Sequence, residues 1–297
     1  MTDMRTRFVE TTIECLDNDA RTAVVLADIS ADQFSEAAVR HPSRVVNVGI
    51  REQLMVSVGG GLALSGLTPV VHSYAPFLVE RSFEQVKLDF GHQGAKGILV
   101  SVGASYDTSS GGRTHHAPED VALIDTLPGW RTLVPGHADE VPALLRDAFH
   151  RPESTYLRLS SQSNQAARPS AASGRLEVLR RGSGPVVIAV GPMLDPVLEA
   201  CDGLDVSVAY TSTVRPLDTA GLRTLAPHGE VVLVEPYLTG TSARQVDLAL
   251  ADRPHRTLSL GVSRMELRRY GTPADHDAAY GLDPASLRRS ITDFLTS

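Results

Sequence analysis

Residues that could do acid–base chemistry include one glutamate and a pair of adjacent histidines. Glu52 opens a segment with helical spacing (50–65), directly after a β-branched run, and His115 and His116 lie in a glycine-containing loop. Histidine suits proton transfer because small environmental shifts move its charge change across neutral pH. Taken alone, a glutamate in a first helical turn is typical of a solvated carboxylate, and a loop histidine is typical of the surface. Whether these residues act in catalysis or lie on the solvated surface depends on the elements that position them.

Short apolar runs alternate with helical patterns along the first part of the chain. We expect strands at 23–28, 44–48, 69–73, 96–102, 130–135 and 155–160, and helices at 50–65, 76–92, 118–126 and 138–149. The expected strands are almost continuously apolar, which is typical of strands buried on both faces of a parallel sheet. This alternation predicts an α/β domain.

A change in composition predicts a second domain. Residues 160–174 are rich in Ser, Ala, Gln and Pro and contain no large apolar side chain, which is typical of a linker. Strand-like runs resume at 185–190, 205–210, 230–236 and 256–262, and a helical pattern follows at 284–295. We therefore expect two α/β domains with parallel-based sheets, at 1–160 and 185–297, joined by a linker at 161–184.

The composition excludes several functional classes. Of the 297 residues, 42% are apolar and 21% charged, and the net charge of −7 argues against a nucleic-acid partner. No apolar run reaches the roughly 18 residues of a membrane span, and the charged N-terminus lacks the apolar region of a signal peptide, so we expect a cytoplasmic protein. P-loop, dinucleotide-binding and zinc motifs are missing from the sequence, and we assign no metal ligand. The glycine-rich run 59–66 lies inside a helical pattern, which indicates close helix packing.

Three segments resemble, in their order and spacing, transketolase-like enzymes that use thiamine diphosphate. They are VVNVGIREQLMVSVGGGLALSG (45–66), SYAPFLVERSFEQVKLD (73–89) and SSGGRTHHAPEDVALIDTLPGW (109–130). The resemblance extends to the C-terminal domain of the same enzymes through TVRPLD (213–218), VVLVEP (231–236) and YGLDPASL (280–287). It thus covers nearly the whole chain.

The resemblance implies a division of the enzyme into two subunits. Such enzymes have a first domain that binds the cofactor's diphosphate through Mg²⁺ with a Gly-Asp-Gly…Asn signature, then a pyrimidine-binding domain and a C-terminal domain. Gly-Asp-Gly does not occur in this sequence. The resemblance therefore implies the C-terminal subunit of a two-subunit transketolase, which transfers a two-carbon ketol or related acyl-anion unit. An N-terminal partner subunit would hold the diphosphate and Mg²⁺, in an α2β2 assembly.

The resemblance also implies roles in cofactor binding. Glu52 occupies the position whose carboxyl group hydrogen-bonds N1′ of the cofactor's pyrimidine, a role that suits a carboxylic acid in apolar surroundings. Phe77, or alternatively Tyr74, corresponds to the aromatic ring stacked on that pyrimidine; the other interpretation is a core aromatic at a strand-to-helix junction. Asp28 and Ile29 correspond to an Asp-Leu pair near the thiamine and the subunit contact, or else to an ordinary turn.

The substrate side of the resemblance involves the histidine loop. His115 corresponds to the family's catalytic histidine, which faces the cofactor's reactive carbon and bonds substrate oxygens. His116 and Arg113 are further substrate-binding candidates in the same loop.

Two departures from the family concern the substrate. Where transketolases of sugar phosphates place basic residues, this chain has Gly103 and Ser161, so we expect substrates other than simple sugar phosphates. Arg113 or Arg158 is an alternative source of positive charge. Two other functions stay open: the beta subunit of a 2-oxoacid dehydrogenase, which passes an acyl group to a lipoyl carrier, and a non-catalytic scaffold. The Thr-His-His loop favours transketolase over the first, and the presence of both Glu52 and a loop histidine argues against the second.

Overall fold

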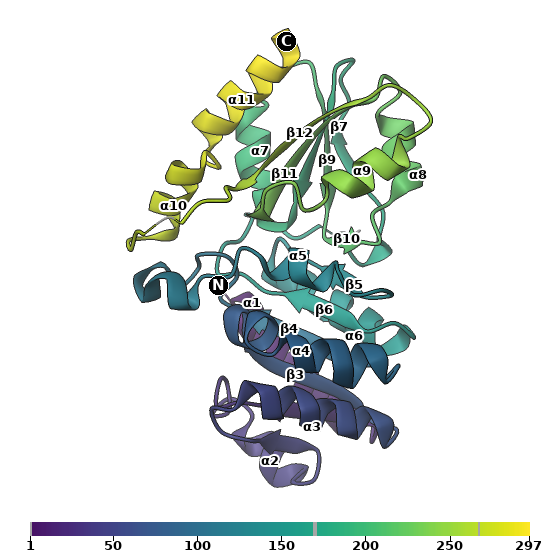
Figure 1. Ribbon diagram of the computed structural model, residues 1–297, viewed down its shortest axis with the longest axis vertical. Helices are drawn as coiled ribbons and strands as arrows, with labels where there is room; N and C mark the ends of the chain where they lie inside the picture. The colour runs from purple at the N-terminus through teal and green to yellow at the C-terminus, as the bar shows by residue number, and fades with distance from the viewer. Residues whose placement is uncertain (1, 169–170, 267) are drawn as a thin grey trace.

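The computed structural model describes residues 2–168, 171–266 and 268–297. Two sheets lie one above the other along the long axis of the molecule, and helices flank each of them (Figure 1). The first sheet has seven strands and the second has five. The prediction of two α/β units with parallel-based sheets is confirmed.

The first sheet is parallel except at one edge. Its spatial order is β10-β5-β6-β4-β3-β1-β2, with β1 at Thr22–Leu26, β2 at Val45–Asn47, β3 at Thr68–Tyr74, β4 at Ile98–Val102, β5 at Arg131–Leu133, β6 at Thr155–Arg158 and β10 at Thr213–Arg215. Strands β1 and β4 are buried along their whole length, which explains their continuous apolar sequence. Strand β10 comes from the C-terminal half of the chain and pairs antiparallel with β5.

Helices cover both faces of this sheet, because side chains of a strand point alternately to its two sides. The helices are α1 (Met4–Asn18), α2 (Ser35–Arg40), α3 (Glu52–Leu64), α5 (Asp120–Ile124) and α6 (Val141–His150). Val24 of β1 belongs to a core that includes side chains of α1 and α6, and Val25 belongs to the core on the opposite face. The cofactor candidates of the sequence lie at the carboxyl ends of the strands, where α/β sheets bind their ligands.

The segment 76–92, predicted as one helix, is a series of short turns of different width. It consists of η1 (Pro76–Glu80) and η2 (Val86–His92), both π-helical, with the short α4 (Phe83–Gln85) between them. A π-helical turn contains an extra residue, so it shifts every following side chain around the helix axis. Such turns are frequent at functional sites.

The second sheet repeats the same architecture. Its order is β12-β11-β8-β9-β7, with β7 at Glu177–Arg180, β8 at Val186–Val190, β9 at Ser207–Thr211, β11 at Glu230–Leu238 and β12 at Arg256–Val262. Helices α7 (Leu194–Ala200) and α11 (Pro284–Thr296) pack against each other, as do α8 (Thr219–Leu225) and α9 (Ala243–Ala249). The capped helix α10 (Pro273–Tyr280) precedes α11.

The segment predicted as a linker contains one strand. Within 161–184, β7 pairs antiparallel with β9 at the edge of the second sheet. Its side chains are all half-buried, so its sequence lacks the continuous apolar character of a central strand. The described residues also form 3-10 turns: η3 (Ser109–His115), η4 (Ala138–Glu140), η5 (Ala171–Ser173) and η6 (Gly191–Met193). Among the described residues, none of the helices combines the length and the apolar character that crossing a bilayer requires.

Candidate functional site

The centre of the site is a buried carboxylate. Glu52 is the first residue of α3, directly after the strand β2 and a turn at Gly49, whose φ of 72° suits glycine. Only 2% of Glu52 is exposed. Its Oε2 atom lies 2.8 Å from Nη1 of Arg81, which donates to it. Glu52 is therefore a buried acid held by a cation, and not the solvated carboxylate that its position alone suggests.

An aromatic cluster lies beside this ion pair. Tyr74 ends β3, Phe77 lies in the first π-helical turn, and His115 ends η3. The ring centroids of Phe77 and His115 are 5.4 Å apart, and each of these rings lies 6.1 Å from Tyr74, all in edge-on arrangements. The guanidinium carbon of Arg81 lies 4.2 Å from the centroid of Phe77. One side chain thus links the carboxylate to the aromatic cluster.

Arg81 was not singled out in the sequence. Phe77 and Arg81 are four residues apart in a segment with helical spacing, and side chains at that spacing contact each other. This spacing could have predicted the stacking contact. It could not have predicted the contact with Glu52, because that depends on how η1 packs against the start of α3.

The pyrimidine end of the expected cofactor fits these side chains. A flat group with N–H donors, the guanidinium of Arg81, already lies against Phe77 and bonds Glu52. An aminopyrimidine is also flat and also offers nitrogen atoms at its edge, so the same two side chains would stack on it and bond it. In the described part of the chain, no group of three or more His, Cys, Asp or Glu side chains could hold a metal ion.

Asp28 and Ile29 follow the carboxyl end of β1. Asp28 is exposed and has a positive φ of 64°. Its Oδ1 accepts a hydrogen bond from Nδ2 of Asn47 at 2.9 Å, and its backbone N–H donates to Oδ1 of the same side chain at 3.1 Å. Ile29 packs against the core on one face of the sheet. The pair therefore forms a turn that joins the ends of β1 and β2, close to where α3 begins.

The two adjacent histidines have different environments. His115 is half-buried, and its Nδ1 lies 2.9 Å from Oγ1 of Thr114. His116 is buried at 5% exposure and lies edge-on to His276 of α10, with the ring centroids 5.1 Å apart. Burial and the neighbouring His276 lower the pKa of His116. Of the two, His115 belongs to the aromatic cluster, whereas His116 packs against His276 of α10.

Arg113 and His116 line a pocket between the two domains. This pocket has a volume of about 290 Å³, and Leu238 and Tyr280 line it from the C-terminal domain. The Arg113 guanidinium is paired with Glu119 at 2.8 Å and with Glu266 at 3.5 Å. Its charge is therefore neutralised by two carboxylates within the chain.

Glu119 also lies beside Glu80, the residue before Arg81. Oε1 of Glu80 and Oε2 of Glu119 are buried, and neither has a hydrogen-bond partner among the described atoms. Burial, and then the neighbouring Glu119 carboxylate, raise the pKa of Glu80 to about 7. The sequence did not indicate this pair, because the two glutamates lie in different segments.

A further pocket, of about 370 Å³, adjoins Tyr74. Gly103 and Ser161, the two positions at which the family places basic residues, both line it. Arg158, the alternative cation, is 1% exposed; its Nε lies 2.7 Å from Oδ2 of Asp120, so it is a buried structural ion pair. The pocket therefore extends the candidate site beyond the aromatic cluster.

Comparison with protein families gives two matches that together span most of the chain. The model of the transketolase pyrimidine-binding domain matches residues 1–165, and the model of the transketolase C-terminal domain matches residues 174–287.

Two kinds of curated relative are similar to this chain. A protein of Rhodococcoides fascians, described as an uncharacterized 33.6 kDa protein in the fasciation locus, is 51% identical over 99% of this chain and 95% of its own length. The 1-deoxy-D-xylulose-5-phosphate synthase of Alkalilimnicola ehrlichii is 34% identical over 88% of this chain. The match covers only 42% of that synthase. This chain thus spans less than half the length of the synthases that it matches.

Solved structures share the fold over the whole chain. A split-gene transketolase, in a structure described as an inactive beta4 tetramer, superimposes with a TM-score of 0.85 at 24% identity, covering 99% of this chain and 98% of the other. Transketolase from Campylobacter jejuni superimposes with a TM-score of 0.82 at 16% identity, covering 98% of this chain and 46% of the other. At these identities the likeness establishes the arrangement of both domains.

Proposed function

We propose, because this chain belongs to the transketolase family, that it is the pyrimidine-binding and C-terminal half of a thiamine diphosphate-dependent transferase assembled from two different subunits. The observation that carries the proposal is the shared guanidinium of Arg81, which stacks on Phe77 and bonds the buried Glu52. A flat, nitrogen-bearing group is already accommodated between these two side chains.

Glu52 would hold a proton at Oε2 and share it with N1′ of the pyrimidine. Thiamine diphosphate, when bound, would supply a nucleophilic carbon that adds to the carbonyl carbon of a donor substrate. A carboxylic acid suits this role because its O–H group can donate to a ring nitrogen. With Glu52 only 2% exposed, bulk water does not compete for that hydrogen bond.

The aromatic side chains would orient the cofactor and the substrate. Phe77 would stack on the pyrimidine, and Tyr74 is the alternative stacking ring. His115 contacts both of these rings, and it would donate a hydrogen bond to a substrate oxygen or accept one from it. His116 and Arg113 belong to the interdomain pocket, where they would bind the substrate only if it extends between the two domains. Asp28 and Ile29 would lie at the edge of the cofactor site, next to the partner.

The transferred group would be a two-carbon ketol or related acyl-anion unit. The family membership and the similarity to deoxyxylulose-phosphate synthases support a transferase of this kind. The partner would be an N-terminal subunit that holds the diphosphate and Mg²⁺, in an α2β2 assembly located in the cytoplasm. The split-gene transketolase that shares this fold over nearly its entire length supports a division into two chains.

Calorimetry tests the two-subunit assignment. Thiamine diphosphate with Mg²⁺ is titrated into the purified chain, and then into its complex with a partner that carries the Gly-Asp-Gly…Asn signature. We expect weak binding or none by the chain alone and tight binding by the complex, since Mg²⁺ requires carboxylate and amide oxygens next to the phosphates. Titration of the complex without Mg²⁺ is the control. Tight, Mg²⁺-dependent binding by the isolated chain would contradict the two-subunit proposal.

Activity assays on the complex distinguish the alternatives. Transfer of a two-carbon unit to an aldehyde acceptor supports the proposed transferase. Reductive acylation of a lipoyl domain would identify the beta subunit of a 2-oxoacid dehydrogenase instead. Tight cofactor binding by the complex without either reaction would indicate a non-catalytic role.

A further inference from the structure

The pocket beside Tyr74 contains a cation, Arg5, whose terminal nitrogens are unbonded among the described residues. Arg5, in the first turns of α1, lines this pocket together with Tyr74, Gly103 and Ser161. Its Nε donates a hydrogen bond to Oγ of Ser30 at 2.9 Å. Within the described ranges, the two terminal nitrogens Nη1 and Nη2 of Arg5 have no hydrogen-bond partner and no ion pair.

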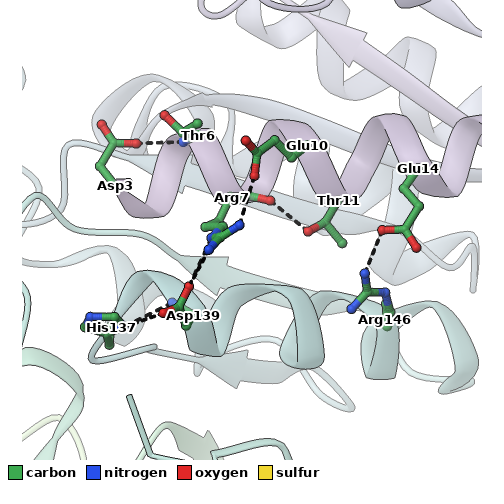
Figure 2. Close-up of polar contacts among 9 residues, drawn as sticks. All are labelled: Asp3, Thr6, Arg7, Glu10, Thr11, Glu14, His137, Asp139 and Arg146. Carbon is green, nitrogen blue, oxygen red and sulfur yellow. Dashed lines mark hydrogen bonds and ion pairs between the residues drawn. The ribbon is translucent and has the colours of Figure 1, made fainter. Parts of the chain in front are cut away.

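The helix that carries Arg5 is firmly held. The Asp3 side chain caps α1 by accepting from the backbone N–H of Thr6 at 2.7 Å. Figure 2 shows two ion pairs that join α1 to the segment η4–α6. Nη2 of Arg7 lies 2.8 Å from Asp139, and Glu14 lies 2.6 Å from Arg146. These contacts fix the backbone from which Arg5 extends.

The guanidinium of Arg5 is also oriented at its base. Oγ of Ser30, which accepts from Nε, lies 2.9 Å from Nε2 of the fully buried His72. His72 in turn bonds the backbone carbonyl of Val100 through Nδ1 at 2.8 Å. A chain of hydrogen bonds therefore runs from the core of the sheet to the guanidinium, and the unbonded nitrogens are the end of that chain. A side chain positioned in this way binds a ligand with little further loss of conformational entropy.

The other charges of the pocket decide which anion suits it. The carboxylate of Asp107 accepts hydrogen bonds from the backbone N–H groups of Ala104 at 3.0 Å and Ser161 at 2.8 Å, and from the Ser160 hydroxyl at 2.9 Å. Asp3 also lines the pocket. A phosphate dianion would meet two carboxylates and a single arginine. A carboxylate carries one negative charge, and the two terminal nitrogens of arginine match its two oxygens.

We propose that Arg5 binds the carboxylate of a small organic acid in the pocket beside Tyr74, and that this acid is a substrate of the enzyme. That the acid is a substrate rests on the proposed function, because Tyr74 belongs both to this pocket and to the aromatic cluster around His115. The binding of the acid rests on Arg5 alone. Arg5 thus selects substrates that carry a carboxylate over neutral ones of the same size.

Ligand-observed NMR on the full chain tests this assignment. The probes are pyruvate, its uncharged methyl ester and inorganic phosphate, and the variants are Arg5→Ala and Arg5→Lys. The matched control is Arg21→Ala, which removes an exposed arginine that pairs with Asp19 and does not line the pocket. Loss of a charge-assisted hydrogen bond in Arg5→Ala is expected to weaken pyruvate binding about 10- to 100-fold. Arg5→Lys should retain part of the affinity, and Arg21→Ala should bind pyruvate as the unmodified chain does.

The methyl ester separates charge recognition from shape. Its binding should be weak in the unmodified chain and should not change in Arg5→Ala. Equal pyruvate affinities in the unmodified chain and Arg5→Ala would overturn the proposal, as would the absence of any pyruvate binding. If phosphate bound more tightly than pyruvate and this binding depended on Arg5, the choice of a carboxylate as the ligand would be overturned. These measurements do not require catalysis. If Arg5 binds pyruvate but the complex turns over no donor, the proposed function is wrong and the binding of the acid by Arg5 stands.

Discussion

Nη1 of Arg81 lies 2.8 Å from Oε2 of Glu52 while the same guanidinium covers one face of the Phe77 ring. The two partners differ in exposure, because the Glu52 side chain is 3% exposed and that of Arg81 is 43% exposed. The ion pair needs an ionised carboxylate, whereas sharing a proton with a ring nitrogen needs a proton at that oxygen. A cofactor that stacks on the same face of Phe77 and bonds the same oxygen of Glu52 would therefore displace Arg81.

Replacement of Arg81 by methionine should expose this competition. Arg81→Met leaves the buried Glu52 carboxylate without its cation, so the cofactor-free protein should lose about 1–3 kcal/mol of stability. Thiamine diphosphate with Mg²⁺ should then stabilise the variant complex more than it stabilises the unmodified complex, because no guanidinium has to leave. Thermal unfolding with and without the cofactor measures both effects.

The control for this variant is Arg51→Met. Arg51 is the exposed neighbour of Glu52 at the start of α3, and its substitution changes the net charge by the same amount. It should change neither the stability nor the response to the cofactor. The same cofactor-induced rise in melting temperature in Arg81→Met and in the unmodified complex would show that Arg81 and the cofactor do not compete.

Replacement of Glu52 by glutamine should nearly abolish turnover by the complex. Glutamine keeps the shape of the side chain but cannot supply the shared proton, so kcat should fall about 10²- to 10⁴-fold. Glu84→Gln, on the exposed surface of α4, is the matched control and should retain full activity. Loss of a single acid–base group usually costs far more than tenfold in rate. If Glu52→Gln kept more than about a tenth of the activity, another residue would supply the proton to N1′.

The sequence predicts the sheets well and the site only in part. Val186–Val190 is buried at every position, so its apolar run is a sufficient signal for a central strand. The contact of Arg81 with Glu52 depends on the wide turns of the segment 76–92, which the helical spacing does not distinguish from an α-helix. Arg5 and Tyr74 line the same pocket only because α1 packs beside the sheet. Contacts between distant segments depend on the tertiary structure, and local patterns do not encode them.

The contribution of Glu80 to the stability of the chain should fall as the pH rises from about 4.5 to about 7. Burial and the neighbouring Glu119 raise the pKa of Glu80 from its ordinary 4.5 to about 7. The folded state therefore binds more protons than the unfolded state between these values, and the stabilisation present below pH 4.5 is lost up to about pH 7. Glu80 is partly exposed, so solvent screening limits the effect to about 1–2 kcal/mol.

Urea unfolding at a series of pH values measures this loss. Glu80→Gln has no titrating group at this position, so its stability should decline less between pH 4.5 and 7. Glu84→Gln, one turn further along, should follow the unmodified chain. Parallel pH profiles for Glu80→Gln and the unmodified chain would contradict the assignment of this transition to Glu80.

Two glycines of α3 should respond in opposite directions to alanine. A Cβ atom at Gly59 would lie 2.6 Å from Cγ2 of Val71 and 3.2 Å from the Phe90 ring, so Gly59→Ala should cost about 1–3 kcal/mol of stability. A Cβ atom at Gly61 would meet nothing within 4 Å, and Gly61→Ala should stabilise the helix by about 0.5–1 kcal/mol. Denaturant unfolding of both variants checks the interpretation of this run as a packing motif. A stabilising effect of Gly59→Ala would refute it.

The last prediction concerns the substrate class of the complex. Gly103 and Ser161 line the pocket beside Tyr74 without supplying a cation, so kcat/KM should favour pyruvate or an unphosphorylated ketose over xylulose 5-phosphate. Ser161→Arg should raise kcat/KM for xylulose 5-phosphate about tenfold or more, the scale of one charge-assisted hydrogen bond. The exposed Ser161 bonds Asp107 through its backbone N–H, so the substitution preserves that contact. Ser163→Arg adds the same charge two residues further along the chain and should have little effect. A preference of the unmodified complex for xylulose 5-phosphate would contradict this prediction, because it would mean that the cations for the phosphate come from elsewhere in the assembly.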